Sequence, residues 1–345
     1  MASKRTSVVI IGAGNFARHH AECTVKMGKG VRLAGFVEPS EASRQQMREW
    51  YASLGEREVP PFFTTLKEFL AANAGPADCA VIVVPHSLHV SYIVECMMAG
   101  MDVLVEKPMV LDCAEARRVI RVRNRTGRLL SVAFPGSFSP GIRKVKDMVA
   151  AGEIGAIRAI VGYCHQNWHS LVEPHSWKRN PAISGGGFLF DTGSHLVNTM
   201  VDLGGADVKA LSVMQDNSVA LELSTAMMGR FANGIFFTLA AEGDSVNCQS
   251  RIVLIGTKGV LTTSMYGDLL RIIRPGCFLE QDVPVPPSLG VFEQFLRVRE
   301  GTLENPCPAE VGLRFAKLMD LVRSAIGKSE NAGKRSNPKS RGALP

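Results

Sequence analysis

Residues 7–17 read SVVIIGAGNFA, and this stretch decides the fold. The apolar residues 8–11 are followed directly by Gly12, Gly14 and Ala17, which form the pattern G-x-G-x-x-(G/A). In such a turn the first glycine permits a tight bend and the second lets the backbone approach a pyrophosphate. The small third residue lets the following helix pack closely on the strand, and the helix N-terminus favours an anion. The stretch therefore predicts a strand–turn–helix unit that binds a dinucleotide.

The alternation of strand and helix continues through the first 134 residues. Short apolar runs without in–out alternation predict parallel strands covered on both faces, and they lie at 7–12, 31–38, 78–84, 101–106 and 128–134. Helical patterns separate these runs at about 15–28, 40–53, 65–73, 87–99 and 112–126. We therefore predict a doubly wound α/β dinucleotide-binding domain with a parallel sheet over residues 1–134.

The second part of the chain has a different pattern. It begins after the turn-forming stretch FPGSFSPG, with the boundary expected near Phe134–Ser139. Apolar strand patterns then follow one another with few helices between them, and the helices are expected near 138–151, 186–203, 288–300 and 308–326. This predicts a C-terminal α/β domain with a large open mixed or antiparallel sheet over 135–326. Residues 327–345 have no apolar period and are expected to form a disordered tail.

The composition is that of a globular protein with a sizeable core, at 46% hydrophobic and 21% charged residues. No apolar run approaches the ~18 residues of a membrane helix, so no membrane partner is expected. The net charge is +7; the tail carries five basic residues against one acid, and Lys4 and Arg5 add two, leaving 7 − 4 − 2 = +1 for the body. A nucleic-acid footprint on the folded domains is therefore not expected.

The cysteine pattern bears on the compartment. The eight cysteines form no CxxC pair, and several lie inside apolar runs, where free cysteine behaves as a small hydrophobe. The N-terminal apolar run is short and ends in glycines, unlike a signal peptide. A reducing compartment is favoured over a disulfide framework, and we predict a cytoplasmic protein.

The end of the second predicted strand indicates which dinucleotide binds. Glu38 lies 38 − 17 = 21 residues after Ala17. A carboxylate there can accept hydrogen bonds from the ribose hydroxyls of the adenosine, and it would repel a 2′-phosphate. NAD is favoured as the cofactor, with NADP possible because Arg44 is near in sequence. The alternative is a glycine turn that binds nothing.

Two further strand ends carry polar residues. The stretch DVLVEKPM (102–109) passes from an apolar strand directly to Glu106, Lys107 and Pro108. Ligands of open α/β sheets bind outside the carboxyl ends of the strands, so Lys107 could point towards a nicotinamide and Glu106 could pair with it. Pro108 ends the strand, and a cis Lys107–Pro108 bond is possible. The alternative is a solvated surface lysine.

The stretch VVPHSLH (83–89) ends the preceding strand in the same way. Pro85, His86 and His89 could line the cofactor there. A surface position or a helix-capping role is the alternative for either histidine.

A glycine-rich stretch, GGGFLFDTGSH (185–195), contains an acid–base pair. Asp191 and His195 are spaced i, i+4 and would share one face of a helix. The carboxylate could then orient the imidazole or raise its basicity. Such a pair is often only structural, but the three glycines at 185–187 allow close backbone approach just before it.

The stretch CHQNWHSLVEPH (164–175) contains residue types that bind metals. If 156–166 is a strand, its cysteine and the adjacent histidine face opposite ways, so we predict no metal site. One or two side chains of this region are expected to face the substrate pocket instead; the candidates are His165, Trp168, His169, His175 and Trp177.

Three motifs in this order, GAGNFA, EKP and GGGFLFDTGSH, resemble the glucose–fructose oxidoreductase/inositol dehydrogenase/MocA (Gfo/Idh/MocA) family. The stretch IRKVKDMVAAGEIGAIRAI (142–160) is similar to that family's domain-joining segment. SWKRNPAISGGG (176–187) resembles its run into the third motif. The likeness covers nearly the whole chain except the tail, and the three motifs together are far more specific than any one of them.

The resemblance implies an N-terminal Rossmann domain and a C-terminal α/β domain whose open sheet often forms the subunit interface, hence a homodimer or homotetramer. It implies NAD(P)-dependent oxidation or reduction of a small molecule: a sugar, a cyclitol or a related diol. It also implies a catalytic set of Lys107, Asp191 and His195. His86 stands where the family frequently has Asn, and Asn198 where it frequently has Asp. These departures bear on substrate identity more than on the chemistry.

The motifs and the resemblance lead to one mechanistic hypothesis. His195 accepts the proton of the substrate hydroxyl, Lys107 stabilises the developing negative charge, and Asp191 holds a substrate hydroxyl or the imidazole. The predicted cofactor-binding residues are Gly12, Gly14, Asn15, Phe16, Ala17, Glu38, Pro85, His86, His89, Glu106 and Lys107. The alternatives are a redox-neutral, NAD-dependent glycoside hydrolase or lyase on the same scaffold, and a non-catalytic NAD-binding regulator.

Overall fold

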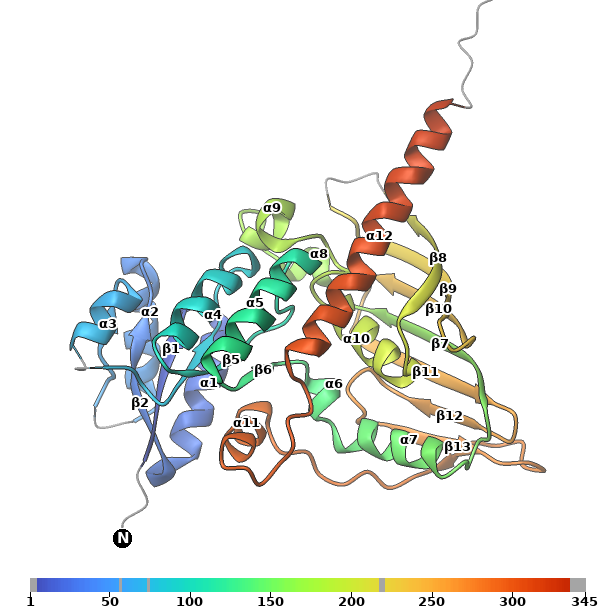
Figure 1. Ribbon diagram of the computed structural model, residues 1–345, viewed down its shortest axis with the longest axis horizontal. Coiled ribbons are helices and arrows are strands. Elements are labelled where there is room, and N and C mark those ends of the chain that lie inside the picture. Colours follow the sequence, from blue (N-terminus) through green and yellow to red (C-terminus); the bar gives the residue numbers. More distant parts are fainter. Residues whose placement is uncertain (1–4, 56–57, 73–74, 217–220, 336–345) are drawn as a thin grey trace, which may run out of the picture.

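The computed structural model describes residues 5–55, 58–72, 75–216 and 221–335. Two β-sheets lie side by side, each with helices packed against it (Figure 1). Among the described residues, no helix is both long enough and apolar enough to cross a membrane.

The first sheet is parallel and has the strand order β3-β2-β1-β4-β5-β6. Its strands are β1 (Thr6–Ile11), β2 (Val31–Val37), β3 (Phe62–Phe63), β4 (Cys79–Ile82), β5 (Asp102–Val105) and β6 (Leu130–Val132). The central strands are buried on both faces, which explains their continuous apolar runs. The strand order reverses between β1 and β4, and in such sheets the ligand crevice lies at this point.

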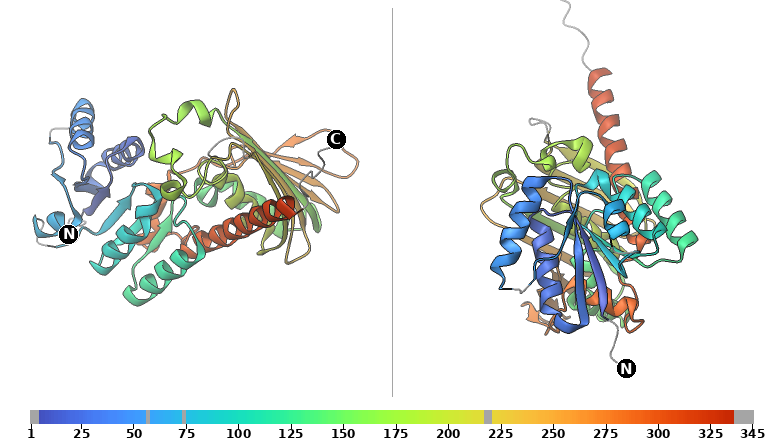
Figure 2. Two further views of the ribbon diagram at one scale, coloured as in Figure 1. Left: turned by 90° about the horizontal axis from the view of Figure 1, so that it is seen from above. Right: turned by 90° about the vertical axis from the view of Figure 1, so that its left-hand side faces the viewer.

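Helices cover both faces of the first sheet (Figure 2). They are α1 (Asn15–Lys26), α2 (Glu41–Ser53), α3 (Leu66–Ala72), α4 (His89–Met98) and α5 (Cys113–Thr126), with short 3₁₀ turns η1 (Gly28–Gly30) and η2 (His86–Leu88). Local signals define their ends: Asp112 caps α5 by accepting from the Glu115 N–H, and Gly127 ends it in the left-handed conformation at φ 64°.

The second sheet is mixed and has the order β14-β13-β12-β11-β7-β10-β9-β8. Its strands are β7 (Ile157–His165), β8 (Val208–Gln215), β9 (Ser224–Phe231), β10 (Phe236–Glu242), β11 (Gln249–Gly256), β12 (Val260–Thr263), β13 (Leu270–Ile273) and β14 (Gln281–Asp282). β7 and β10 pair in parallel, and the other pairings within the described residues are antiparallel. The predicted large open sheet is confirmed.

The remaining helices pack on one face of the second sheet or connect the two sheets. They are α6 (Pro135–Phe138), α7 (Pro140–Ala150), α8 (Trp168–Leu171), η3 (Trp177–Arg179), α9 (Pro181–Ser184), α10 (Gly193–Gly204), α11 (Val291–Arg299) and α12 (Ala309–Arg335). α7, α10 and α12 contact the sheet. Phe292 and Phe295 of α11 join the core of the first sheet, so the chain returns to the dinucleotide-binding part after building the second sheet.

Two expected helix boundaries differ from the structure. The helix expected at 186–203 begins only at Gly193, because the residues before it form the turn that carries the third motif. The helix expected to end near 326 continues as α12 to Arg335, so the expectation of disorder is wrong for 327–335. Extending an existing helix adds one hydrogen bond per residue without a new nucleation step, so no apolar period is needed. Residues 336–345 lie outside the described part of the chain.

Candidate active site

The turn between β1 and α1 has the geometry of a pyrophosphate cradle. Gly12 has φ +104°, and a Cβ atom there would collide with the carbonyl oxygen of Val83. A Cβ atom at Gly14 would instead project into open space, which leaves room for a ligand against the backbone. No side chain caps the N-terminus of α1 at Gly14, so its first N–H groups are available to an anion, and the fully buried Ala17 packs beneath them. Asn15 and Phe16 are exposed in the first turn of α1.

Glu38 lies beside this turn, as the prediction of a ribose-binding carboxylate requires. Its Oε2 accepts a hydrogen bond from the Ala13 N–H at 3.0 Å, and its Oε1 accepts from the Ser40 N–H at 2.9 Å. Arg44 is the residue that made NADP a possible cofactor in the sequence analysis. It donates to the backbone carbonyls of Glu38 and Pro39 and pairs with Glu41. The guanidinium is therefore already engaged on the protein.

The EKP turn divides its two charges between two different partners. The Glu106 carboxylate lies 2.8 Å from Nε2 of His20, a buried residue of α1, and its other oxygen accepts from the Lys107 backbone N–H at 3.3 Å. The Lys107 ammonium points away from it, towards Asp191. The hypothesis that Glu106 pairs with this ammonium is wrong, because each group has a different partner. The Lys107–Pro108 bond is cis, as the sequence suggested.

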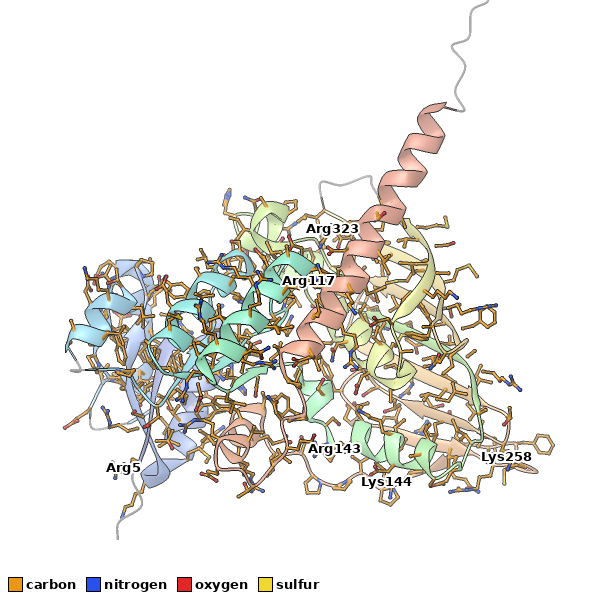
Figure 3. All side chains as sticks on the ribbon, viewed as in Figure 1. Arg5, Arg117, Arg143, Lys144, Lys258 and Arg323 are labelled. Atoms are coloured by element: carbon orange, nitrogen blue, oxygen red, sulfur yellow. The ribbon has the colours of Figure 1, made fainter. Side chains whose placement is uncertain are left out.

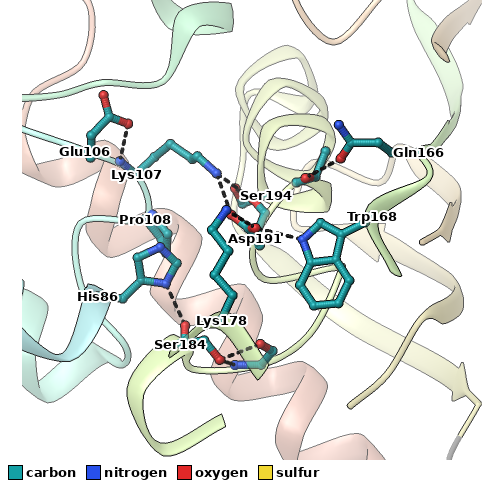
Figure 4. A network of polar contacts seen from close by, with 12 residues as sticks. His86, Glu106, Lys107, Pro108, Gln166, Trp168, Lys178, Ser184, Asp191 and Ser194 are labelled. Atoms are coloured by element: carbon teal, nitrogen blue, oxygen red, sulfur yellow. Dashed lines mark hydrogen bonds and ion pairs between the residues drawn. The ribbon is translucent and has the colours of Figure 1, made fainter. Parts of the chain in front are cut away.

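The Asp191 carboxylate is the centre of the polar network in Figure 4. Lys107 donates from Nζ to Oδ1 at 3.0 Å and to the Asp191 backbone carbonyl at 2.9 Å. Lys178 donates from Nζ to Oδ2 at 2.6 Å, and the indole N–H of Trp168 donates to the same oxygen at 2.8 Å. Lys107 comes from the first sheet, whereas the other donors come from the segment between β7 and α10, so this carboxylate joins the two halves of the molecule.

The electrostatics of the network set the charge of each group. Burial alone would raise the pKa of the Asp191 carboxyl, but the ammonium groups of Lys107 and Lys178 outweigh it and hold that pKa well below its usual range. Burial lowers the pKa of His195 well below its usual range, and the same two lysines lower it further against the opposing effect of Asp191. The site therefore holds an ionised carboxylate beside a neutral imidazole at neutral pH.

Aromatic rings hold the His195 imidazole. It lies edge-on to Phe134, with ring centroids 6.1 Å apart, and against Tyr266 at 5.1 Å. Its Nδ1 is buried without a hydrogen-bond partner among the described residues, while part of the residue stays exposed. Within the described residues the Asp191 carboxylate bonds to the lysines and Trp168 rather than to this ring. The i, i+4 hypothesis that Asp191 orients the imidazole therefore does not describe the contacts found.

The three glycines of the third motif permit a close backbone approach. Both carboxylate oxygens of Glu222 lie 2.7 Å from the Gly187 N–H, and a Cβ atom at Gly187 would collide with Glu222. Gly185 has φ +88°, and a Cβ atom there would press into the Phe190 ring. This confirms the expectation of close approach, and it shows that the approaching group is Glu222, just before β9 of the second sheet.

The two histidines of the VVPHSLH stretch behave differently. His86 is buried, its Nδ1 lies 2.7 Å from the Ser184 carbonyl oxygen, and its ring centroid is 4.7 Å from that of Trp177. It thus connects the end of β4 to the segment that leads into the third motif, next to the position expected for the nicotinamide. His89 is completely buried, and its ring nitrogens lie 2.9 Å from the Pro108 carbonyl oxygen and 3.0 Å from that of Val84. Its burial argues against direct contact with a cofactor.

The stretch from Cys164 to His175 contributes packing and polar contacts. Cys164 is buried on one face of β7, while His165 stacks on Tyr163 on the other face, as the strand pattern predicted. No group of three or more His, Cys, Asp or Glu side chains in the described ranges could hold a metal ion. Among the candidates for the pocket, Trp168 contacts Asp191 and Trp177 contacts His86.

The sequence analysis missed three polar residues of the site, namely His20, Lys178 and Tyr266. Lys178 lies in the quoted stretch SWKRNPAISGGG, but the side chain of a loop residue has no periodicity that would reveal its direction. His20 follows from the motif only if α1 is known to pass behind the EKP turn. Tyr266 comes from the turn after β12, 71 residues beyond His195 in the chain (266 − 195 = 71). None of these contacts is local in sequence.

Comparison with known proteins shows the family of the chain. A family model described as "Oxidoreductase family, NAD-binding Rossmann fold" matches residues 6–134, and the GFO/IDH/MocA C-terminal domain model matches residues 142–262. An uncharacterized oxidoreductase, ORF334, of Rhizobium meliloti is 38% identical over 34% of this chain and 34% of its own. The D-xylose 1-dehydrogenase [NADP(+)] of Haloarcula marismortui is 27% identical over 56% of each chain. The chain thus matches only about a third to just over half the length of these two relatives.

A solved structure matches over almost the full chain. The aldose-aldose oxidoreductase of Caulobacter crescentus, crystallised with glycerol, superposes with a TM-score of 0.80 and 22% identity. The match covers 94% of this chain and 98% of that one. At this identity the likeness establishes the shared fold.

The buried neutral histidines predict a pH-dependent stability. Burial, with a smaller contribution from His89, lowers the pKa of His86 to about 3. Between about pH 6.5 and that value the unfolded chain binds a proton that the folded protein does not, so stability falls as pH falls. The slope for one such group is about 1.4 kcal/mol per pH unit. We expect His86→Asn to reduce the fall in the free energy of unfolding between pH 6 and pH 4.5, measured by urea denaturation.

A matched control is His175→Asn, because His175 is exposed whereas His86 is buried. That variant should follow the wild-type slope. Equal slopes for wild type and His86→Asn would show that His86 is not held neutral by the fold.

Proposed function

The chain belongs to the GFO/IDH/MocA oxidoreductase family, and on this premise we propose that it oxidises or reduces a secondary alcohol of a sugar, cyclitol or related diol with NAD. The observation that carries the proposal is the meeting of Lys107, Asp191 and His195 at the carboxyl end of the first sheet, next to the nucleotide cradle. The names of the D-xylose dehydrogenase and of the aldose-aldose oxidoreductase support a carbohydrate substrate.

The geometry assigns a role to each side chain. Bound NAD supplies the hydride acceptor. His195 is neutral because burial lowers its pKa, so it can accept the proton of the substrate hydroxyl as the C–H bond breaks. Lys107 uses two of its three N–H donors on Asp191, so we infer that the third stabilises the developing charge on the substrate oxygen. Asp191 holds both ammonium groups in place.

The contacts of Glu38 support NAD over NADP. Its carboxylate is positioned at the glycine-rich turn by two backbone N–H groups, where ribose hydroxyls would meet it. Arg44 is bound to backbone carbonyls and to Glu41, and recruiting it to a 2′-phosphate would break these bonds. The prediction of a cytoplasmic, reducing location rests on the free cysteines and stays a prediction.

The direct test is the absorbance of reduced nicotinamide with NAD or NADP across a panel of sugars, cyclitols and diols. We expect an increase with NAD and at least one substrate class. A second outcome is that NAD raises the melting temperature of the protein while no compound of the panel yields reduced nicotinamide. In that case the redox-neutral enzyme or the regulator replaces the proposal. Tightly held cofactor with turnover of a glycoside and no net NADH would identify the redox-neutral enzyme.

Replacing Lys107 separates catalysis from cofactor binding. We expect Lys107→Met to lower kcat at least about 100-fold, because it removes the donor to the substrate oxygen and leaves Asp191 with one cation. The dissociation constant for NAD, measured by fluorescence titration, should change less than about threefold. Lys258→Met is a control, since Lys258 is exposed at the far end of the second sheet (Figure 3). Parallel losses of turnover and NAD binding in Lys107→Met would contradict the assignment.

We further propose that two copies of the chain associate through the open face of the second sheet. The described helices cover its other face, and this face exposes six large apolar side chains: Val161, Tyr163, Met214, Met228, Phe236 and Ile255. A contiguous apolar surface of this kind marks an interaction site. A sheet face made of alternating outward residues suits a second copy of the same face, which would be self-complementary under twofold symmetry.

The association can be broken by one charge. Val161→Arg on the central strand β7 should shift the mass in solution, measured by light scattering, towards the monomer, because it buries an unpaired guanidinium in the contact. Leu54→Arg, at the end of α2 in the first domain, should leave the mass unchanged. A wild-type protein that is already monomeric at tens of micromolar would rule the interface out.

A further inference from the structure

The candidate site contains more positive charge than its own residues neutralise. The charged groups that act on His195 are Lys107, Lys178 and Asp191. His86 and His195 themselves are neutral, because burial lowers the pKa of each imidazole. The sum is +1 + 1 − 1 = +1 in a partly buried space, where Lys107 is 14% exposed and Lys178 is 35% exposed. An uncompensated charge in such a place favours a ligand of opposite sign.

Nearby acidic groups do not supply the missing charge. Glu106 lies on the far side of the EKP turn and is engaged by His20 and by the Lys107 backbone N–H (Figure 4). Glu222 is bound to the backbone of the glycine turn, and burial raises the pKa of its carboxyl. Oxidised NAD adds a further positive charge at its nicotinamide ring, so the excess grows when the cofactor binds.

Lys178 is the group available to a ligand. Its ammonium uses one donor on Asp191 and has no other hydrogen-bond partner among the described residues, while its side chain is about a third exposed. An ammonium has three donors, so two can serve a bound anion without loss of the Asp191 contact. Its neighbour Arg179 is not available, because it donates to the carbonyls of His169, Val172 and Glu173.

We propose that the substrate is a sugar acid, such as a uronate or an aldonate, and that Lys178 binds its carboxylate. The proposal rests on the proposed function, since it names the substrate class of the same site. Lys178 and Lys107 hold opposite oxygens of one carboxylate, so a sugar carboxylate at Lys178 would bring a ring or chain hydroxyl towards Lys107 and His195. The C–H hydride then goes to NAD and the hydroxyl proton to His195, so atoms and charges balance.

A carboxylate fits this site better than a phosphate ester. A phosphate monoester carries nearly two negative charges and three acceptor oxygens, and it is usually bound by arginines or by a helix N-terminus. Here one ammonium with two free donors faces an excess of one charge. The match in charge and in donor number is to a carboxylate.

The experiment compares matched substrates that differ only in the acid. Initial rates of NADH formation are measured with galactose and galacturonate, with glucose and glucuronate, and with glucose 6-phosphate as the phosphate arm. We expect kcat/KM for the acid to exceed that for its neutral partner at least about 10-fold at low ionic strength. The ratio should shrink as salt is added, since the Debye length is about 10 Å at 0.1 M salt.

Three variants locate the preference. Lys178→Gln should bring the acid-to-neutral ratio to within about threefold of one, and Lys178→Arg should keep most of it because the charge remains. Lys258→Gln, which removes one positive charge from an exposed surface position far from the site, should leave the ratio unchanged. The ratio is the readout because a general structural loss would lower both rates together.

The possible outcomes separate this inference from the proposed function. The sugar-acid inference is overturned if the acid-to-neutral ratio of kcat/KM is near one. It is also overturned if Lys178→Gln lowers kcat/KM equally for the acid and for the neutral sugar. Either result leaves the proposed dehydrogenase activity standing. A larger gain with the phosphate arm also overturns it. If no sugar, cyclitol or diol is turned over with NAD or NADP, the proposed function falls. The inference is then decided by the melting-temperature shift with galacturonate and NADH: it stands if that shift exceeds the shift with galactose and is lost in Lys178→Gln, and falls otherwise.

Discussion

The molecule depends on the ion pair between the Lys107 ammonium and the buried Asp191 carboxylate. Lys107 lies just after β5 of the first sheet, and Asp191 lies in the turn before α10 of the second part. The pair therefore fixes one half against the other at the point where chemistry is expected. Burying an ionised carboxylate is costly unless several donors satisfy it. The Trp168 indole and the Lys178 ammonium complete that set, so residues from three segments must be in place together.

This arrangement changes how the histidine has to work. In a triad a carboxylate bonds the imidazole, selects its tautomer and raises its basicity. Here the lysines occupy the carboxylate, and His195 is positioned by the edges of Phe134 and Tyr266. The imidazole is therefore a weak base because burial lowers its pKa, and the nearby ammonium groups lower that pKa further. A substrate anion at the site would oppose that effect, so the basicity of the histidine is tied to the charge of what binds.

The elements that the sequence predicts well are those with a local signature. The run SVVIIG is apolar at every buried position of β1, and only glycine tolerates the position next to the Val83 carbonyl, so the first strand and turn were predictable. Helix α10 was predicted seven residues too early because its preceding turn is shaped by Glu222, whose position comes from the second sheet (193 − 186 = 7). The motifs predicted Lys107, Asp191 and His195 as site residues. They did not predict the partner of each charged group, because the partners lie far apart in the sequence. The contact between Glu106 and His20 shows this most clearly.

The departure at His86 fits the same electrostatic logic. Asparagine, frequent at this position in the family, would be neutral at any pH and would offer both a donor and an acceptor. The buried histidine is also neutral near pH 7, since burial lowers its pKa to about 3, and its Nδ1 is committed to the Ser184 carbonyl. It therefore adds no charge to a site that already has one positive charge in excess. What it adds is a rigid aromatic contact with Trp177, the residue directly before Lys178. The histidine thus bears on the position of Lys178, the residue that we propose binds the carboxylate of the substrate.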